Sequence, residues 1–308
     1  MKIDSKQKDI VTKIYEEIFK KINENYVDVF LCGGASNAKE QSDRDKVMAK
    51  LNTYRNIRIH YPEDLFMEML KTDKTQDLMS LESFLADNSD YICIICESAG
   101  SLVELGAFTN NEKTVGKVIA AFDERRKNDE SFIMMGPAAY LKKRKSQKKN
   151  IVYYSKKNID MLVEELSGIF GINKLKRRGS LHNNPINNTK PLNSLIGLYY
   201  FILLILFFYK QLTSEDIANL IKYLYRKYRL EEEKNFDTLF QPSIKLLQKH
   251  KLLDKHLYKE EQSRLSSYTL TEKGYNTVND LLDNLLITNR TVLYDRISFD
   301  IMLNKYYT

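Results

Sequence analysis

The pattern of apolar and polar positions over residues 1–175 predicts strands that alternate with helices. Apolar residues recur at helical spacing in the first segment, where isoleucines stand at positions 10, 14, 18 and 22 between charged residues. Short, largely apolar runs then predict five strands: Val27–Leu31, Ile57–His60, Tyr91–Cys96, Val118–Phe122 and Ile151–Tyr154. Five strands separated by helices indicate an α/β fold with a doubly wound, parallel five-stranded sheet.

The pattern changes after residue 175. Gly179–Pro191 is rich in Asn, Gly and Pro and has no periodicity, which is typical of a linker. We therefore expect an α/β domain over 1–175, a basic, Asn-rich linker over 176–192 and a second, mainly helical domain over 193–308. The second domain opens with Leu195–Tyr209, an almost wholly apolar run. It is short for a membrane span, so we favour a buried helix or a subunit interface.

The segment Tyr91–Phe108 carries the most distinctive chemistry. A buried strand is followed by a short turn, Glu97–Gly100, and by a helix that we expect Ser101 to open. This order places Glu104 at the carboxyl edge of the sheet, where open α/β sheets bind ligands. A structural interpretation competes, because Ser101 and Glu104 have the spacing of a capping box in which Glu104 serves only the helix end.

A second loop at the same edge follows the first strand. Cys32-Gly-Gly-Ala-Ser-Asn37 consists mostly of small residues, which let backbone N–H groups approach a ligand oxygen or phosphate. The alternative is a plain tight turn. Asp43, which we expect one to two turns into the next helix, points either toward this cleft or to solvent on the helix surface.

Charge is distributed unevenly along the chain. Residues 141–190 hold 13 Lys and Arg against 3 Asp and Glu, whereas the whole chain has a net charge of +7. Such runs form either a solvated surface or a contact to a nucleic-acid backbone. The candidate nucleic-acid-binding residues are Lys142, Lys143, Arg144, Lys145, Lys176, Arg177 and Arg178.

Cysteine and histidine usage points away from metal and disulfide chemistry. The three cysteines lack disulfide-like spacing, which indicates a reducing compartment, and we expect Cys93 and Cys96 to be core residues of a strand. The four histidines form no ligand cluster, so we predict no metal. The amino-terminal residues are polar and lack an export signal, so we expect a cytoplasmic protein.

Gly100-Ser-Leu-Val-Glu104-Leu-Gly106 resembles the G-x-x-x-E-L-G segment of nucleoside 2-deoxyribosyltransferases and related deoxynucleotide N-glycosidases. It also resembles the G-T-x-x-E signature of cytokinin-activating phosphoribohydrolases, with Ser101 replacing Thr. The resemblance implies that Glu104 attacks the anomeric carbon of the sugar. Ile133-Met-Met-Gly136 matches the loop at the sheet edge of this transferase family, which in several members reaches into a neighbouring subunit's site. The match implies a homo-oligomer formed through the N-terminal domain.

A departing purine also needs a proton, and Glu97 or Asp90 is the candidate acid. Glu97 stands where the transferases commonly have Asp, which leaves the substrate class open. The candidate substrate-binding residues are Cys32, Gly33, Gly34, Ser36, Asp43, Ser98, Gly100, Ser101 and Met135.

The second domain resembles the winged helix-turn-helix of bacterial regulators. Helices are predicted over Thr213–Ile221 and Phe236–His250, and a polar hairpin over Leu252–Leu270 ends in Tyr268-Thr-Leu-Thr-Glu-Lys-Gly274. Such a module binds either DNA or protein.

A deoxyribosyltransferase-like domain joined to a winged helix resembles the effector encoded beside a retron reverse transcriptase and its multicopy single-stranded DNA (msDNA). The resemblance implies a toxic anti-phage N-glycosidase, held by the reverse transcriptase–msDNA complex, with NAD or a nucleotide as substrate and no cofactor. Two alternatives remain, a housekeeping nucleoside deoxyribosyltransferase and a non-enzymatic, nucleotide-sensing DNA-binding regulator.

Overall fold

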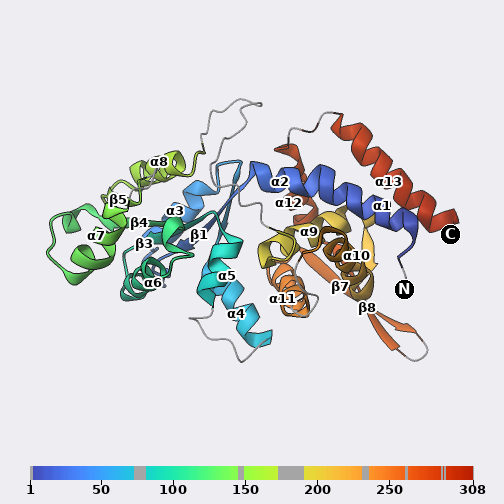
Figure 1. Ribbon diagram of the computed structural model, residues 1–308, viewed down its shortest axis with the longest axis horizontal. Coiled ribbons are helices and arrows are strands. Elements are labelled where there is room, and N and C mark those ends of the chain that lie inside the picture. Colours follow the sequence, from blue (N-terminus) through green and yellow to red (C-terminus); the bar gives the residue numbers. More distant parts are fainter. Residues whose placement is uncertain are drawn as a thin grey trace. The chain divides into compact units, whose positions relative to one another are not determined.

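The structure is a computed structural model of the 308-residue chain. It describes residues 3–72, 81–144, 149–172, 191–230, 236–260, 263–285, 287 and 289–307. The chain forms two compact units (Figure 1). An α/β unit comprises Tyr26–Met67 and Thr75–Asn188, and a mainly helical unit comprises Met1–Asn25, Glu68–Lys74 and Thr189–Thr308.

The α/β unit is built on a five-stranded, all-parallel sheet, as the sequence predicts. The strands are β1 (Val27–Cys32), β2 (Ile57–His60), β3 (Tyr91–Ile95), β4 (Val118–Asp123) and β5 (Ile151–Tyr154). Their order is β2-β1-β3-β4-β5. Every predicted strand agrees with an observed one to within one residue. The inner strands β1, β3 and β4 are buried throughout, which explains their nearly continuous apolar sequences.

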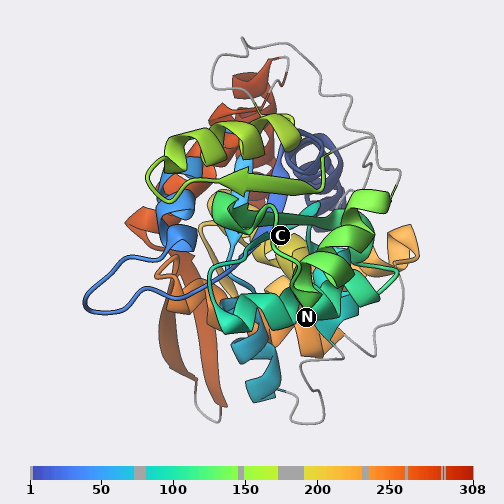
Figure 2. The ribbon, with the colours of Figure 1, turned by 90° about the vertical axis from the view of Figure 1, so that its left-hand side faces the viewer.

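Helices cover both faces of this sheet. They are α3 (Asp43–Leu51), α4 (Pro62–Thr72), α5 (Leu81–Asn88), α6 (Ala99–Asn110), α7 (Ala139–Lys143) and α8 (Ile159–Ile169). Apolar side chains of α3 and α8 share one core with alternate residues of the strands. Figure 2 shows α8 and α6 on opposite sides of the strands, and α6 contacts β3 and β4. The sheet is therefore wound on both faces.

The three cysteines are buried in the α/β unit, and Cys93 belongs to the core just described. Cys32, Cys93 and Cys96 are all free and buried, as expected for Cys93 and Cys96 as core residues. No group of three or more His, Cys, Asp and Glu residues among the described residues could hold a metal ion.

The helical unit surrounds one buried helix. Almost every residue of α9 (Leu195–Tyr209) is buried, and it contacts α11 (Phe236–Lys249), α12 (Glu272–Asp283) and α13 (Arg290–Tyr307). Its apolar sequence thus serves the core of its own unit, which agrees with the first of the two interpretations favoured from sequence. In the described part of the chain, no helix combines the length and hydropathy that crossing a membrane requires.

The same unit contains a small antiparallel sheet. Strand β6 (Gln211–Thr213) is followed by α10 (Ser214–Tyr228) and α11, and then by the hairpin of β7 (Leu253–Glu260) and β8 (Ser263–Leu270). The strands are ordered β6-β8-β7. Two helices thus stand between the first strand and the hairpin of one three-stranded sheet.

The amino-terminal residues differ from the expected division of the chain, which placed them with the sheet. The segment α1 (Ser5–Lys13), η1 (Ile14–Phe19) and α2 (Lys20–Asn25) belongs to the helical unit. Its isoleucines are buried as predicted, but its aromatic residues pack against α9, with ring centroids of Phe19 and Phe201 5.1 Å apart. An amphipathic pattern predicts a buried face but does not name the partner, which explains the difference.

The expected linker falls mostly outside the described residues. Of positions 176–192, the structure describes only Pro191 and Leu192.

Candidate active site

The candidate site lies where β1 and β3 end side by side. In the order β2-β1-β3-β4-β5 the chain leaves β1 toward β2 on one side and β3 toward β4 on the other. Such a switch point leaves a crevice at the carboxyl edge of the sheet, and ligands of open α/β proteins bind there. The segments Gly33–Ser42 after β1 and Glu97–Ser101 after β3 both start at this edge.

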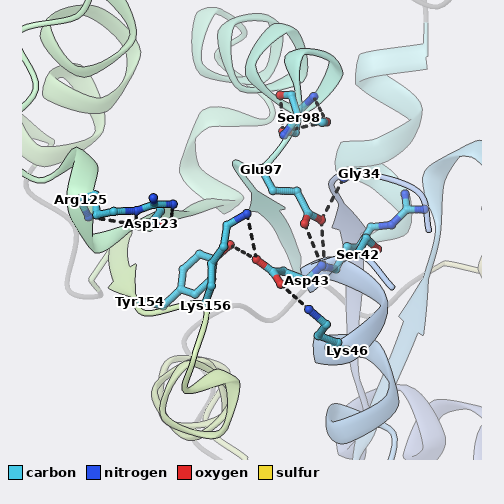
Figure 3. Close-up of polar contacts among 12 residues, drawn as sticks. Gly34, Ser42, Asp43, Lys46, Glu97, Ser98, Asp123, Arg125, Tyr154 and Lys156 are labelled. Atoms are coloured by element: carbon cyan, nitrogen blue, oxygen red, sulfur yellow. Dashed lines mark hydrogen bonds and ion pairs between the residues drawn. The ribbon is translucent and has the colours of Figure 1, made fainter. Parts of the chain in front are cut away.

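Glu97 fastens these two segments together. Its Oε1 accepts hydrogen bonds from the backbone N–H groups of Gly34 (3.1 Å) and Arg44 (3.0 Å), and its Oε2 accepts one from Asp43 N–H (2.8 Å) (Figure 3). Two of these donors belong to the first turn of α3. The sequence predicts that backbone N–H groups of this loop bind a ligand, but the Gly34 N–H instead donates to a side chain of the protein itself.

Helix α6 begins earlier than predicted. Ser98 is its N-cap, and Ser98 Oγ accepts the Ser101 N–H (3.2 Å) while Ser101 Oγ accepts the Ser98 N–H (3.1 Å). The capping box expected between Ser101 and Glu104 is therefore wrong. The turn accommodates three fewer residues than assumed, so Ser98 takes the capping position and Ser101 the reciprocal one.

Glu104 consequently has no capping duty. It lies in the second turn of α6, half-buried, and its Oε2 is shielded from solvent without a hydrogen-bond partner. Burial raises the pKa of Glu104 to about 7, with a further upward contribution from Glu63 and an opposing one from Arg44. A buried carboxyl oxygen without a partner is costly, and such groups concentrate at functional sites.

Arg44 and Glu63 form an ion pair that the sequence analysis did not identify. Arg44 Nη1 lies 2.5 Å from Glu63 Oε1, and the guanidinium stacks on Tyr61 at 4.3 Å from the ring centroid. Tyr61 in turn donates to Asp45 Oδ1 (2.6 Å). The signal was present, because Tyr61-Pro-Glu63 directly follows the strand Ile57–His60 and so reaches the same sheet edge.

Asp43 lies on another side of the α3 N-terminus. Its carboxylate is buried, accepts from Tyr154 OH (3.0 Å) and pairs with Lys46 (3.0 Å) and Lys156 (3.9 Å) (Figure 3). These contacts make Asp43 a bridge between α3 and the carboxyl end of β5. Of the two expectations for Asp43, cleft or solvent, solvent is wrong, since the side chain is needed to connect two elements.

Asp90 does not join the site. It precedes β3, at the amino edge of the parallel sheet, and its Oδ2 accepts the Asp28 N–H (2.8 Å). Glu97 and Glu104 follow the same strand at the opposite edge. Asp90 is therefore corrected from a candidate acid to a buried structural residue, because residues before and after a strand lie at its two ends.

The other expected binding residues differ in their surroundings. Cys32 is buried at the end of β1, and burial, followed by Glu104 and Glu63, raises the pKa of its thiol well above the usual range. Gly33 has a positive φ of 155°, and a Cβ there would lie 2.9 Å from Arg44 Cβ. Ser36 is exposed and accepts from Ser42 N–H (3.0 Å), and Gly100 is exposed on α6.

Met135 is an exposed residue of η4 (Met134–Ala138), a segment that contacts α6. The basic candidates are only partly described. Lys142 and Lys143 are exposed in the last turn of α7, and exposed Arg144 follows them. Lys145, Lys176, Arg177 and Arg178 lie outside the described residues.

Fold and site together define an α/β protein with a carboxylate-centred site at the switch point of its sheet. Over residues 40–255 the chain matches the family model described as STM3845 retron effector protein. It therefore belongs to this family of retron effectors.

Two relatives from Escherichia coli support this membership. A protein of retron Ec86 is 27% identical over an alignment of 312 residues that covers 97% of this chain and 92% of the relative. A protein of retron Ec73 is 30% identical over 145 residues, 46% of each chain. Both are named "putative ribosyltransferase/DNA-binding protein".

Proposed function

We propose that this retron effector is an N-glycosidase that cleaves the N-glycosidic bond of NAD or of a nucleotide, with Glu104 as nucleophile. The observation that carries the proposal is the half-buried Glu104, whose Oε2 lacks a hydrogen-bond partner at the switch point. The capping box of α6 is formed by Ser98 and Ser101, so Glu104 is not part of it. The ribosyltransferase in the relatives' names agrees with glycosyl-transfer chemistry.

The proposed reaction has two steps. A Glu104 oxygen attacks the anomeric carbon, and the C–N bond breaks with its electron pair leaving on the base, so that a glycosyl ester of Glu104 forms. Water then cleaves the ester, which restores the carboxylate and releases a proton. Nicotinamide leaves NAD as a neutral molecule because its ring was cationic, whereas a purine leaving group needs a proton.

A transferase is the second candidate, because the relatives' names specify transfer. The two activities share the glycosyl ester and differ in what accepts the sugar. A hydrolase turns over in water alone, while a deoxyribosyltransferase needs a second base. Product formation with and without an added base decides between them.

We further propose that the helical unit contains a winged helix that docks on the retron's reverse transcriptase or its msDNA. The order strand, two helices, hairpin within one three-stranded sheet supports this. Exposed lysines of the second helix and the turn after it, Lys245, Lys249 and Lys251, suit a phosphate backbone. The relatives' names include DNA binding. This proposed partner complex would hold the effector inactive in the cytoplasm until phage infection.

Oligomerisation through the α/β unit is also proposed. Val103 on α6, Phe132 and Met135 are 73%, 85% and 69% exposed. Val103 adjoins Glu104 in sequence, and η4, which contains Met135, contacts α6. Exposed apolar residues next to a candidate site support an interface that completes the site.

The test is release of nicotinamide from NAD by purified full-length protein, alone and with reverse transcriptase and msDNA. Glu104→Gln should lower the rate about a thousandfold. Glu112→Gln, an exposed carboxylate just after α6, is the matched control and should leave the rate unchanged. Equal rates for wild type and Glu104→Gln would refute Glu104 as nucleophile, and a panel of nucleotides tests the remaining substrates if NAD stays intact.

A further inference from the structure

We infer that Glu97 is a positioning residue whose carboxylate fills the anion-binding position of the β1–α3 loop and so holds the loop in place beside Glu104. The loop's backbone and the start of α3 present three N–H groups, from Gly34, Asp43 and Arg44, and all three donate to this one side chain. The role differs from that of a proton donor.

The position that Glu97 occupies is one that usually attracts a ligand. The first N–H groups of a helix have no partners within the helix, and the helix dipole adds positive potential there. In nucleotide-binding sheets a phosphate takes this place after the first strand. Here the end of the neighbouring strand supplies a carboxylate instead, so any phosphate of the substrate must bind elsewhere.

The three hydrogen bonds that Glu97 accepts, here called the Glu97 clamp, also affect the neighbours of Glu104. Glu97 accepts the backbone N–H of Arg44. The side chain of the same residue packs on Gly33 and pairs with Glu63. Arg44 and Glu63 are the two charged residues that act on the Glu104 carboxyl. Fixing the backbone of Arg44 thus fixes the electrostatic surroundings of Glu104, a step that rests on the proposed function of Glu104.

The hydrogen bonds also argue against Glu97 as the acid that protonates a leaving group. Each of the three partners is a donor, so Glu97 must present acceptor oxygens to all of them. An O–H on Glu97 would have to share an oxygen that already accepts a backbone bond. Glu97 serves as the anchor of the loop, and the reaction draws no proton from it.

The first experiment measures amide hydrogen exchange of the full-length protein without substrate. In Glu97→Ala, exchange at Gly34, Asp43 and Arg44 should rise about tenfold or more, while the amides of β3 stay protected. Glu97→Gln keeps one acceptor oxygen for Gly34 and Arg44 but turns an NH₂ toward Asp43. Its effect should therefore concentrate on the Asp43 amide. Unchanged exchange at these amides in both variants would overturn the clamp.

Chemical rescue adds a specific control. Formate, a small carboxylate, should enter the space left in Glu97→Ala and restore protection of the three amides, whereas neutral formamide should not. Rescue by both or by neither would contradict an anion-binding position. Hydrogen exchange is measured without substrate, so this inference can be tested even if the protein does not cleave NAD. The proposed N-glycosidase activity is tested separately, by nicotinamide release.

The kinetic readout separates positioning from acid catalysis. A positioning role predicts that Glu97→Gln retains more activity than Glu97→Ala, and that any alkaline limb of the wild-type pH profile is kept in both variants. An acid role predicts equal losses in the two variants and the disappearance of the profile's alkaline limb. The second pattern would overturn the inference.

Discussion

At the residue scale, Glu104 is a carboxyl group whose surroundings favour its neutral form. Burial is the main cause, and the Glu63 carboxylate adds to it while the Arg44 guanidinium opposes it, so the pKa is raised to about 7. A nucleophile must be ionised to attack, and a pKa near neutrality leaves both forms populated at physiological pH. The ionisation of this one side chain should therefore be visible both in rate and in stability.

The pH–rate profile is the first prediction. Below pH 7 Glu104 is protonated and cannot attack, so kcat/KM should rise about tenfold per pH unit on the acid side and level off above about pH 7. Glu63→Gln removes a neighbouring negative charge and should move the midpoint to lower pH. Initial rates from pH 5 to 9 test this, and a profile that falls through this range would count against Glu104 as the ionised nucleophile.

The second prediction is a pH-dependent change in stability. Because the folded-state pKa of Glu104 is raised from 4.5 to about 7, the folded protein binds more protons than the unfolded one in this range. Stability that is present below pH 4.5 is thus lost as pH rises through 7. Glu104→Gln lacks this loss, so its melting temperature relative to wild type should be a few degrees higher at pH 8 than at pH 5. An equal difference at both values would contradict the raised pKa.

At the element scale, the start of α6 decides what Glu104 is free to do. Ser98 and Ser101 accept each other's backbone N–H groups, so the Glu104 carboxyl, one turn further along the helix, has no part in the cap. A shift of the helix start by three residues thus changes a capping residue into a candidate nucleophile. The expected role of Glu104 changes only because the backbone starts the helix at a different residue.

Substitution of the cap is the third prediction. Ser98→Ala and Ser101→Ala each remove one side of the capping box and should each lower the free energy of unfolding by about 1 kcal/mol. At pH 5, where Glu104 is protonated, Glu104→Gln should change it little. Urea unfolding at that pH compares the three variants. If Glu104→Gln lowered the free energy of unfolding as much as Ser98→Ala does, Glu104 would have to be a capping residue after all.

At the scale of the whole molecule, the chain is not divided at a single point in the sequence. The first 25 residues belong to the unit formed by the C-terminal third, with Lys13 and Asp300 3.3 Å apart and Asp4 accepting from Asn304 Nδ2 (3.0 Å). Apart from Glu68–Lys74, which also belongs to the helical unit, the α/β unit thus lies in sequence between the two main parts of the helical one. A substitution near the amino terminus should therefore be felt in the helical unit.

Phe19→Ala is the fourth prediction. Phe19 is fully buried and packs against Tyr15 and Phe201, so its truncation should cost about 3–5 kcal/mol. Hydrogen exchange should rise in α9 and α10 and not in β3 or β4. Met161→Ala, at an exposed position of α8, is the control and should leave stability unchanged. Faster exchange in the sheet instead would contradict the assignment of residues 1–25 to the helical unit.

The sequence by itself determined the five strands, the parallel sheet and the edge at which Glu97 and Glu104 lie. Inner parallel strands are buried on both faces, so each reads as a short apolar run, and the residues that follow such runs must lie at the carboxyl edge. By the same rule Asp90, which precedes its strand, must lie at the opposite, amino edge. It was the chemistry of a carboxylate, and not the pattern, that made Asp90 a candidate.

Only the tertiary structure decided which groups meet at that edge. The Arg44–Glu63 pair joins residues 19 apart, and Glu97 binds N–H groups 53 to 63 residues away. The partner of the first helix, the true cap of α6 and the bridging role of Asp43 were decided in the same way. A local pattern reports the periodicity of one element, whereas these contacts depend on how distant elements pack, and no single stretch of sequence records that.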